Sequence, residues 1–334
     1  MNPNKIRQVG RSLLCLAAIG CAAPAARADD ALAARFAPLG TLIVTQFVSA
    51  PFPHPDRAAG HKYHDEFFSA TDHYSDSTVA MFIPKQFRVT DRIDFLVHFH
   101  GWNNTVAGTL EQFNLIEQFC ASGRNAVLVA PEGPHNAPDS FGGKLEDTNG
   151  FKVFMEEALD KLSASRAFAE LERRAPARID AGLKSAGAEP GAPDAGGRAP
   201  EIGSIILSGH SGGYHVMSAI LDHGGLSGNI REAWLFDALY GGTKNFVAWQ
   251  KRENGRLLDI YTDHGGTQEE TESLMQHYRT NGVPFFAAEE TNSTAANLLT
   301  NKIVFLHTDL THNEVIFRRG EFRQFLETSC LEKE

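Results

Sequence analysis

The sequence has few cysteines, an excess of acidic over basic side chains, and no long apolar run beyond its N-terminal region. Four of its 334 residues are Cys, and 31 Lys and Arg stand against 41 Asp and Glu, for a formal net charge of -10. Because nucleic-acid binding needs a basic footprint, this charge argues against such a partner and favours a neutral small substrate. Without a further run of about 18 apolar residues, a transmembrane bundle is excluded.

Residues 1–28 are typical of a secretory signal peptide. Basic residues precede the apolar stretch Ser12–Ala23, and a small-residue cleavage site ends at Ala28. We therefore expect a periplasmic or secreted protein that begins at Asp29. The loss of four basic residues and no acid then lowers the formal charge from -10 to -14. An alternative cut before Cys21 resembles a lipid-attachment box, and only this lipidation would bring the protein to a membrane.

Only Cys120 and Cys330 remain in the mature chain. In an oxidising compartment the two thiols can form one disulfide, or they can pack as small apolar side chains. The sequence leaves both alternatives open.

Strand-like and helix-periodic segments alternate along residues 29–334, which predicts one α/β domain built on a mostly parallel sheet with helices on both faces. Eight strands are expected, with an antiparallel pair at the start: Thr41–Val48, Thr78–Ile83, Ile93–Phe99, Ala126–Ala130, Ile202–Ser208, Glu232–Phe236, Leu257–Tyr261 and Lys302–Leu306. Apolar spacing predicts helices at Thr109–Cys120, Phe151–Leu162, Tyr214–Leu221 and about Glu314–Leu326. The Gly/Pro/Ala-rich segment 186–200 is predicted to be a flexible surface insertion.

A Gly-x-Ser-x-Gly motif, Gly209–Gly213, lies between a predicted apolar strand and a predicted helix. The motif alone is weak, because chance produces it in about one of seven chains of this composition. Its position strengthens it: the small residues permit a tight strand-to-helix turn, and the helix N-terminus supplies positive potential and a free N–H. Ser211 is therefore a candidate nucleophile. The alternative is a Gly-rich strand-to-helix turn whose serine has no catalytic role.

Two further segments can complete such a site. The strand that ends at His100-Gly101 opens into a polar loop at Trp102, where a backbone N–H can face developing negative charge. His312 follows the last predicted strand, from which an imidazole can reach a nucleophile on a central strand. The alternative for His100, as for His98, is a structural histidine.

In these three features, the His100-Gly101 strand end, the Gly209–Gly213 motif and the late His312, the sequence resembles members of the α/β-hydrolase superfamily. The resemblance covers about residues 41–326. It implies an α/β-hydrolase fold with Ser211 as nucleophile and His312 as general base and then acid. It also implies an oxyanion hole formed by the N–H groups of Trp102 and Gly212, and no cofactor.

Two aspartates are candidates for the acid that orients His312. Asp263 lies in a polar Gly-rich loop after the seventh strand, the commoner position in this superfamily. Asp237 ends the sixth strand, between Phe236 and Ala238. A charge among apolar neighbours is costly unless it is paired, so Asp237 is favoured and Asp263 is the alternative.

Other polar residues near these motifs are candidates for the substrate cleft: His100, His210, Asp139, Ser140 and Tyr240. The region 51–78 is rich in metal-capable side chains, and His61 and His64 are spaced to chelate an ion from one helical turn. A polar loop beside the site is the preferred interpretation, so no metal is expected.

The resulting hypothesis is an exported serine hydrolase that cleaves carboxylic esters through an acyl-serine intermediate. Its partner is a small-molecule ester, and its oligomeric state is open. A peptidase or amidase with the same triad is one alternative. A non-catalytic envelope binding protein on the same fold is another.

Overall fold

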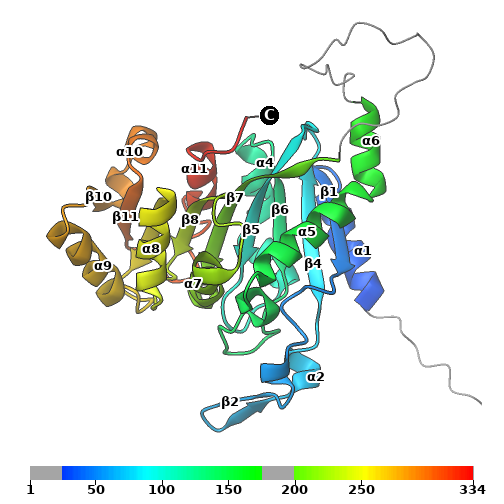
Figure 1. Ribbon diagram of the computed structural model, residues 1–334, viewed down its shortest axis with the longest axis horizontal. Helices are drawn as coiled ribbons and strands as arrows, with labels where there is room; N and C mark the ends of the chain where they lie inside the picture. Colours follow the sequence, from blue (N-terminus) through cyan, green and yellow to red (C-terminus); the bar gives the residue numbers. More distant parts are fainter. Residues whose placement is uncertain (1–24, 175–198, 334) are drawn as a thin grey trace, which may run out of the picture.

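A nine-stranded mixed sheet forms the centre of the molecule, in the order β1-β4-β6-β5-β7-β8-β9-β11-β10 (Figure 1). The computed structural model describes residues 25–174 and 199–333. The strands of the sheet are β1 (Gly40–Gln46), β4 (Thr78–Pro84), β5 (Arg92–Phe99), β6 (Val127–Pro131), β7 (Glu201–His210), β8 (Ile230–Phe236), β9 (Arg256–Thr262), β10 (Phe286–Glu289) and β11 (Ile303–Thr308). A separate hairpin joins β2 (His61–Tyr63) to β3 (Glu66–Phe68).

The predicted α/β class, all eight predicted strands and the antiparallel start are confirmed, since β1 pairs antiparallel with β4. From β6 to β10 the neighbouring strands run parallel, while β4 is antiparallel to β6. The predicted number of strands is wrong, because β10 adds a ninth at the edge. This strand has four residues that alternate between half-buried and exposed, too short and too polar to stand out in the sequence.

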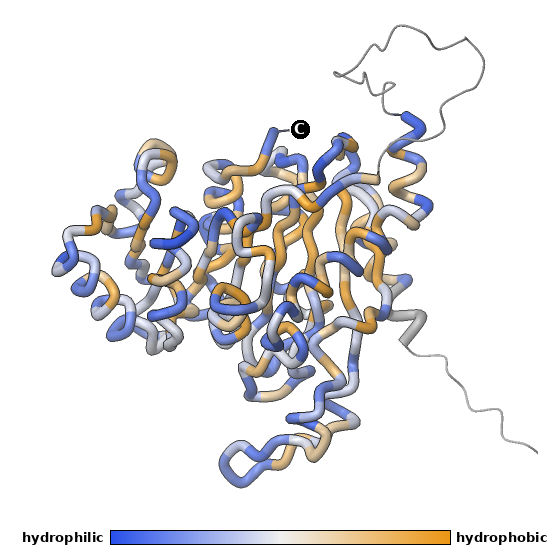
Figure 2. Tube along the Cα trace, in the orientation of Figure 1, coloured by the Kyte–Doolittle hydropathy of each residue, from blue (hydrophilic) through white to orange (hydrophobic). Residues whose placement is uncertain are grey.

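Helices cover both faces of the sheet, and only the short α2 (Ala70–His73) among the described helices lies apart from it, beside β2 (Figure 1). The others are α1 (Ala25–Phe36), α3 (Val106–Gln112), α4 (Leu115–Ala121), α5 (Gly150–Ser163), α6 (Arg166–Arg174), α7 (Tyr214–His223), α8 (Thr243–Glu253), α9 (Gln268–Thr280), α10 (Ala295–Thr300) and α11 (Glu321–Glu327). None of the helices in the described part of the chain is long and apolar enough to cross a membrane. Figure 2 shows apolar residues concentrated along the central strands and polar residues along the outer helices.

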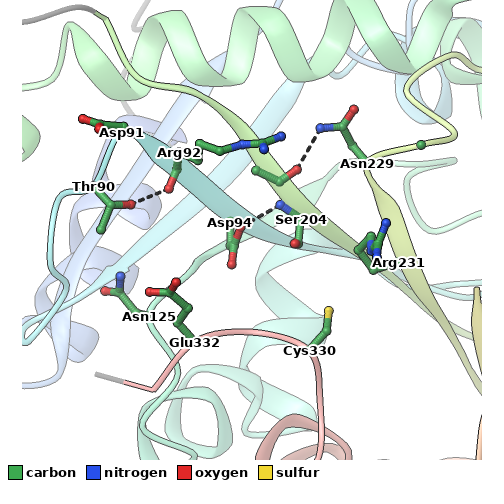
Figure 3. Close-up of a pocket in the computed structure, with 12 residues that line it drawn as sticks. Thr90, Asp91, Arg92, Asp94, Asn125, Ser204, Asn229, Arg231, Cys330 and Glu332 are labelled. Carbon is green, nitrogen blue, oxygen red and sulfur yellow. Dashed lines mark hydrogen bonds between the residues drawn. The ribbon is translucent and has the colours of Figure 1, made fainter. Parts of the chain in front are cut away.

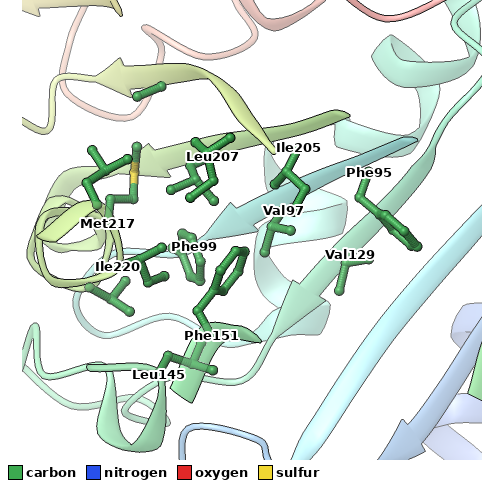
Figure 4. Close-up of a cluster of buried hydrophobic side chains, with 14 of the residues drawn as sticks. Phe95, Val97, Phe99, Val129, Leu145, Phe151, Ile205, Leu207, Met217 and Ile220 are labelled. Carbon is green, nitrogen blue, oxygen red and sulfur yellow. The ribbon is translucent and has the colours of Figure 1, made fainter. Parts of the chain in front are cut away.

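Alternating side chains on the central strands build one core on each face. Phe95, Val97 and Phe99 of β5 point into the core that α5 and α7 cover, where they pack near Phe151 and Met217 (Figure 4). The residues between them face the second core, with aromatic side chains from α4 and α11. Burial of each large side chain contributes roughly 2 kcal/mol, and the strand ends are held rigidly in place as a result.

Two predicted helices differ from the structure. The segment Thr109–Cys120 contains α3 and α4, because Asn114 adopts a left-handed conformation with φ 49° and ends the first helix. The last helix, α11, begins at Glu321, because the residues from Glu314 to Arg319 form turns and Gly320, at φ 77°, precedes the helix as its N-cap.

Three further inferences from the sequence are the signal peptide, the surface insertion at 186–200 and, as one of two alternatives, the Cys120–Cys330 disulfide. Most of the signal peptide and of the segment 186–200 lies outside the described residues, and the expected cut after Ala28 falls in the first turn of α1. Among the described residues, Cys120 and Cys330 form no disulfide with each other, so the disulfide alternative does not hold in this structure.

Candidate active site

Ser211 lies in the turn between β7 and α7 with a left-handed backbone, φ 53°. Its neighbours must be small. A Cβ on Gly209 would lie 2.5 Å from Met217 Sδ, and a Cβ on Gly213 would lie 2.7 Å from the carbonyl oxygen of Phe99. This strained turn raises the serine at the carboxyl end of the central strand, as in a nucleophile elbow.

The loop after β5 approaches the same serine. A Cβ on Gly101 would lie 2.6 Å from Ser211 Cβ and 3.2 Å from Ser211 Oγ, so only glycine permits this approach. Gly212 is the second residue of the 3-10 helix Ser211–Gly213, and its N–H therefore has no acceptor within that helix. The indole of Trp102 donates from Nε1 to Ser140 Oγ at 2.6 Å, and both side chains lie against Gly212.

The structure pairs His312 with Asp237. His312 Nδ1 is 2.5 Å from Asp237 Oδ2, and Asp237 is completely buried. The carboxylate also accepts hydrogen bonds from Thr262 Oγ1, at 3.3 Å, and from Thr267 Oγ1. A buried carboxylate held by two hydroxyl groups and one imidazole is suited to fix the ring and to stabilise its protonated form.

Asp263, the alternative acid, has a different partner. Its Oδ1 is 2.8 Å from His307 Nε2, and its side chain is 52% exposed. The other ring nitrogen of His307 faces Glu289 at 2.9 Å. Partial burial lowers the pKa of His307, but its hydrogen bonds with Glu289 and Asp263 raise the pKa overall. Asp263 therefore belongs to a surface ion pair beside the site.

His210 holds the backbone of the loop that carries His312. Its Nε2–H donates to the carbonyl oxygen of His312 at 2.8 Å, and its ring lies 4.6 Å from the His312 ring between centroids. Burial, followed by the proximity of His312, lowers the pKa of His210 to about 4. His210 is therefore neutral at physiological pH.

A cavity of about 730 Å³ opens over Ser211 and His312. None of its described lining residues is Asp, Glu, Lys or Arg: they are Gly101, Trp102, Asn103, Asn104, Gln112, Ser140, His210, Ser211, Gly212, Tyr214, Tyr240, His312 and Asn313. Neither Gln112, the last residue of α3, nor Asn313, directly after His312, was among the predicted cleft residues.

Two of the predicted cleft residues do not line this cavity. His100 is buried and turned toward the loop after β6, where its Nε2 accepts the N–H of Gly133 at 2.9 Å. Asp139 is engaged by Arg57, whose Nε donates to it at 2.6 Å. The other three candidates, Ser140, His210 and Tyr240, line the cavity.

A second cavity, of about 640 Å³, lies at the opposite, amino ends of β5, β7 and β8 (Figure 3). Its lining includes Asp94, whose carboxylate accepts the Ser204 N–H at 2.6 Å, together with Asn229 and Arg231. None of its described lining residues is a histidine, so this cavity offers Ser204 no imidazole like the one that lines the cavity over Ser211.

If Ser211 is activated through His312 and Asp237, replacing Gly265 with alanine should lower kcat at least a hundredfold without altering those three side chains. A Cβ at this position would lie 1.5 Å from Asp237 Oδ2, so the carboxylate must move away from His312. Gly228→Ala is the matched control, because a Cβ there meets no atom within 4 Å. Steady-state kinetics with a p-nitrophenyl ester, with circular dichroism to verify folding, measure both variants. Unchanged kcat in Gly265→Ala would contradict the assigned position of the acid.

No protein-family model matches the sequence, and no curated protein matches it. Solved structures show a distant likeness. A mutant of the feruloyl esterase module from Clostridium thermocellum is 8% identical, with 87% of this chain and 88% of that chain covered and a TM-score of 0.46. An S-formylglutathione hydrolase from Staphylococcus aureus is 10% identical, with 85% and 97% covered and a TM-score of 0.40. An enterobactin and salmochelin hydrolase is 14% identical, with 89% and 98% covered and a TM-score of 0.41.

These TM-scores are all below 0.5, and the fold is established by the chain's own features. The sheet is mostly parallel, and its central strand β7 leads through a strained serine turn into α7. The serine, the acid at the end of β8 and the histidine after β11 follow in that chain order, at Ser211, Asp237 and His312. The chain has the α/β-hydrolase fold.

Proposed function

We propose that this protein is an exported serine hydrolase that cleaves carboxylic esters through an acyl-Ser211 intermediate. The observation that carries the proposal is the buried Asp237 at 2.5 Å from His312 Nδ1, with Ser211 and His312 lining one uncharged cavity. An idle serine in a glycine-rich turn does not require a histidine oriented by a buried carboxylate.

In the acylation step, Ser211 Oγ attacks the ester carbonyl and His312 Nε2 takes the hydroxyl proton. Asp237 holds the Nδ1–H, so that Nε2 carries the lone pair, and it stabilises the imidazolium that forms. The N–H groups of Gly212 and Trp102 receive the oxyanion. When the tetrahedral intermediate collapses, His312 gives its proton to the departing alkoxide, which leaves as the alcohol.

In the deacylation step, His312 takes a proton from water, and the hydroxide attacks the acyl-serine. Collapse returns the proton to Ser211 Oγ and releases the carboxylic acid. His210 supports both steps by holding the His312 backbone through its Nε2–H, and it stays neutral because its pKa is about 4.

The lining of the cavity favours a neutral acyl group. Aromatic rings of Trp102, Tyr214 and Tyr240 and neutral amides surround Ser211, and no described lining side chain offers a full charge to pair with an anion. We expect kcat/KM for p-nitrophenyl butyrate to exceed that for mono-p-nitrophenyl succinate by at least about tenfold, since an unpaired buried charge costs more than ~1.4 kcal/mol. The two acyl groups have equal chain lengths, so the comparison isolates the charge.

Faster hydrolysis of the succinate ester would contradict this substrate class. An amide and aminopeptidase panel separates the enzyme alternatives, because peptide cleavage faster than ester cleavage would replace the esterase proposal. A protein that turns over neither panel and reacts with no fluorophosphonate would be a binding protein on a hydrolase fold.

Export is the second part of the proposal, and it predicts the mature N-terminus. Expression of the full chain in a bacterium should yield periplasmic or secreted protein whose intact mass begins at Asp29, because the basic and then apolar leader ends in a small-residue cleavage site. A diacylated Cys21 would contradict this cut and place the protein at a membrane. An uncleaved chain retained in the cytoplasm would contradict export itself.

A further inference from the structure

A cluster of three metal-capable side chains lies outside the proposed triad. Asp76 precedes β4, and Glu132 and His135 follow β6. One donor atom from each side chain lies within 4.8 Å of the other two. His61 and His64, the metal-capable pair noted in the sequence, are not part of this cluster, and neither lines the cavity over Ser211.

Two donor atoms in this cluster are buried without a hydrogen-bond partner. They are Glu132 Oε1 and His135 Nδ1, 3.4 Å apart. Glu132 is only 3% exposed, and an unpartnered carboxylate oxygen at such a position is costly. Its other neighbour, His100 Nε2 at 3.5 Å, already accepts the Gly133 N–H and therefore has no proton to donate.

The remaining oxygens and the backbone hold the cluster in position. Glu132 Oε2 accepts the Val106 N–H at 2.9 Å, and Asp76 Oδ1 accepts the Thr78 N–H at 2.8 Å. Each carboxylate thus has one oxygen anchored and the other available. The backbone of His135 is fixed by His73, which accepts its N–H at 2.9 Å and donates from Nδ1 to its carbonyl oxygen at 2.7 Å. Such outer contacts orient metal ligands in proteins.

The distances between the donor atoms fit a bound cation. Two atoms bound about 2.0–2.2 Å from a tetrahedral zinc ion lie roughly 3.3–3.6 Å apart, which includes the 3.4 Å between Glu132 Oε1 and His135 Nδ1. Asp76 Oδ2 is 3.9 Å from His135 Nδ1, and this half-exposed side chain can close the difference by a small rotation. His135 Nδ1 is within ion-pair distance of both carboxylates but makes a well-aligned hydrogen bond to neither.

We propose that Asp76, Glu132 and His135 bind one divalent cation of the zinc class, with water completing its coordination. The donor set of one imidazole nitrogen and two carboxylate oxygens matches zinc rather than the all-oxygen sites of calcium and magnesium. The ion ties the segment before β4 to the loop after β6. That loop contacts His100, and the adjoining Gly101 packs against Ser211, so the ion braces one wall of the candidate active site.

The test uses tag-free protein stripped with EDTA and exchanged into chelator-free buffer, with ZnCl2 as the probe. Isothermal titration calorimetry should show about one zinc per chain, and a hundredfold excess over Kd should raise Tm by at least about 3 °C. In Asp76→Asn and in His135→Gln the affinity should fall at least tenfold. Asp160→Asn and His277→Gln, exposed residues outside the cluster, are the matched controls and should bind as the wild type does.

These readouts do not depend on hydrolysis, so the cation proposal and the proposed esterase function can fail separately. The absence of both a zinc titration and a Tm shift in the wild type would overturn the site and leave an imidazolium–carboxylate pair. Equal zinc affinity in Asp76→Asn, His135→Gln and the wild type would place the ion elsewhere and also overturn it. Calcium binding without zinc binding would overturn the assigned metal class.

Discussion

Asp237→Asn is expected to lower kcat by about 10⁴-fold, whereas Asp263→Asn should cost less than about tenfold. Asparagine can present an N–H to His312 in place of an acceptor, so the imidazole turns to the wrong tautomer and its protonated form loses its partner. This loss equals about 5 kcal/mol of transition-state stabilisation. Asp263 faces His307 and solvent, so its substitution leaves the His312 ring in place. Steady-state kinetics on one ester measure both variants, and KM should change little.

The reverse result would show that the acid follows β9 instead of β8. If Asp263→Asn is the severe variant and Asp237→Asn is mild, Asp263 and not Asp237 orients His312 during the reaction. Severe losses in both would mean that the His307 ion pair supports the site structurally. In that case His307→Gln, which removes the partner of Asp263, should reproduce the loss seen in Asp263→Asn.

Ser211→Ala is expected to reduce kcat by about 10⁶-fold, to the detection limit, because the hydroxyl group that attacks the ester carbonyl is lost. Alanine is small enough for the strained turn, so circular dichroism and Tm should stay close to the wild type. Ser204→Ala is the matched control. Ser204 lies near the amino end of the same strand, β7, beside the cavity that has no histidine among its described lining residues.

The control should retain wild-type kcat within about twofold. Turnover by Ser211→Ala close to that of the wild type would remove this serine from the mechanism. A folded but inactive Ser204→Ala would show that the amino-end cavity influences the reaction, which nothing in its contacts predicts.

The parts of the fold that could be predicted from the sequence are those with a local signal. Apolar strands such as Ile202–Ser208 are bounded by turn residues, and Ser211 is marked by the glycines that a tight strand-to-helix turn requires. Asp237 was favoured because a charge between apolar neighbours needs a partner, and the structure brings it to His312. The same local signals missed β10, which is short and half-exposed, and the helix break at Asn114.

The parts that could not be predicted depend on contacts between distant segments. Thr262 and Thr267 hold the Asp237 carboxylate, but no spacing in the sequence links a hydroxyl group to a carboxylate 25 or 30 residues away. His100 and Asp139 were placed in the cleft because they adjoin motif residues. In the structure, however, His100 points toward the loop after β6, where it accepts the N–H of Gly133. Asp139 accepts hydrogen bonds from Arg57, which lies 82 residues away in the sequence.

Labelling with a fluorophosphonate, followed by peptide mapping, tests the central claim most directly, because the reagent bonds only to an activated nucleophile. The triad predicts one adduct per chain on Ser211, with no labelling of Ser211→Ala and labelling of Asp237→Asn slowed by orders of magnitude. An adduct on another serine, or undiminished ester hydrolysis by protein that takes up no label, would contradict the account.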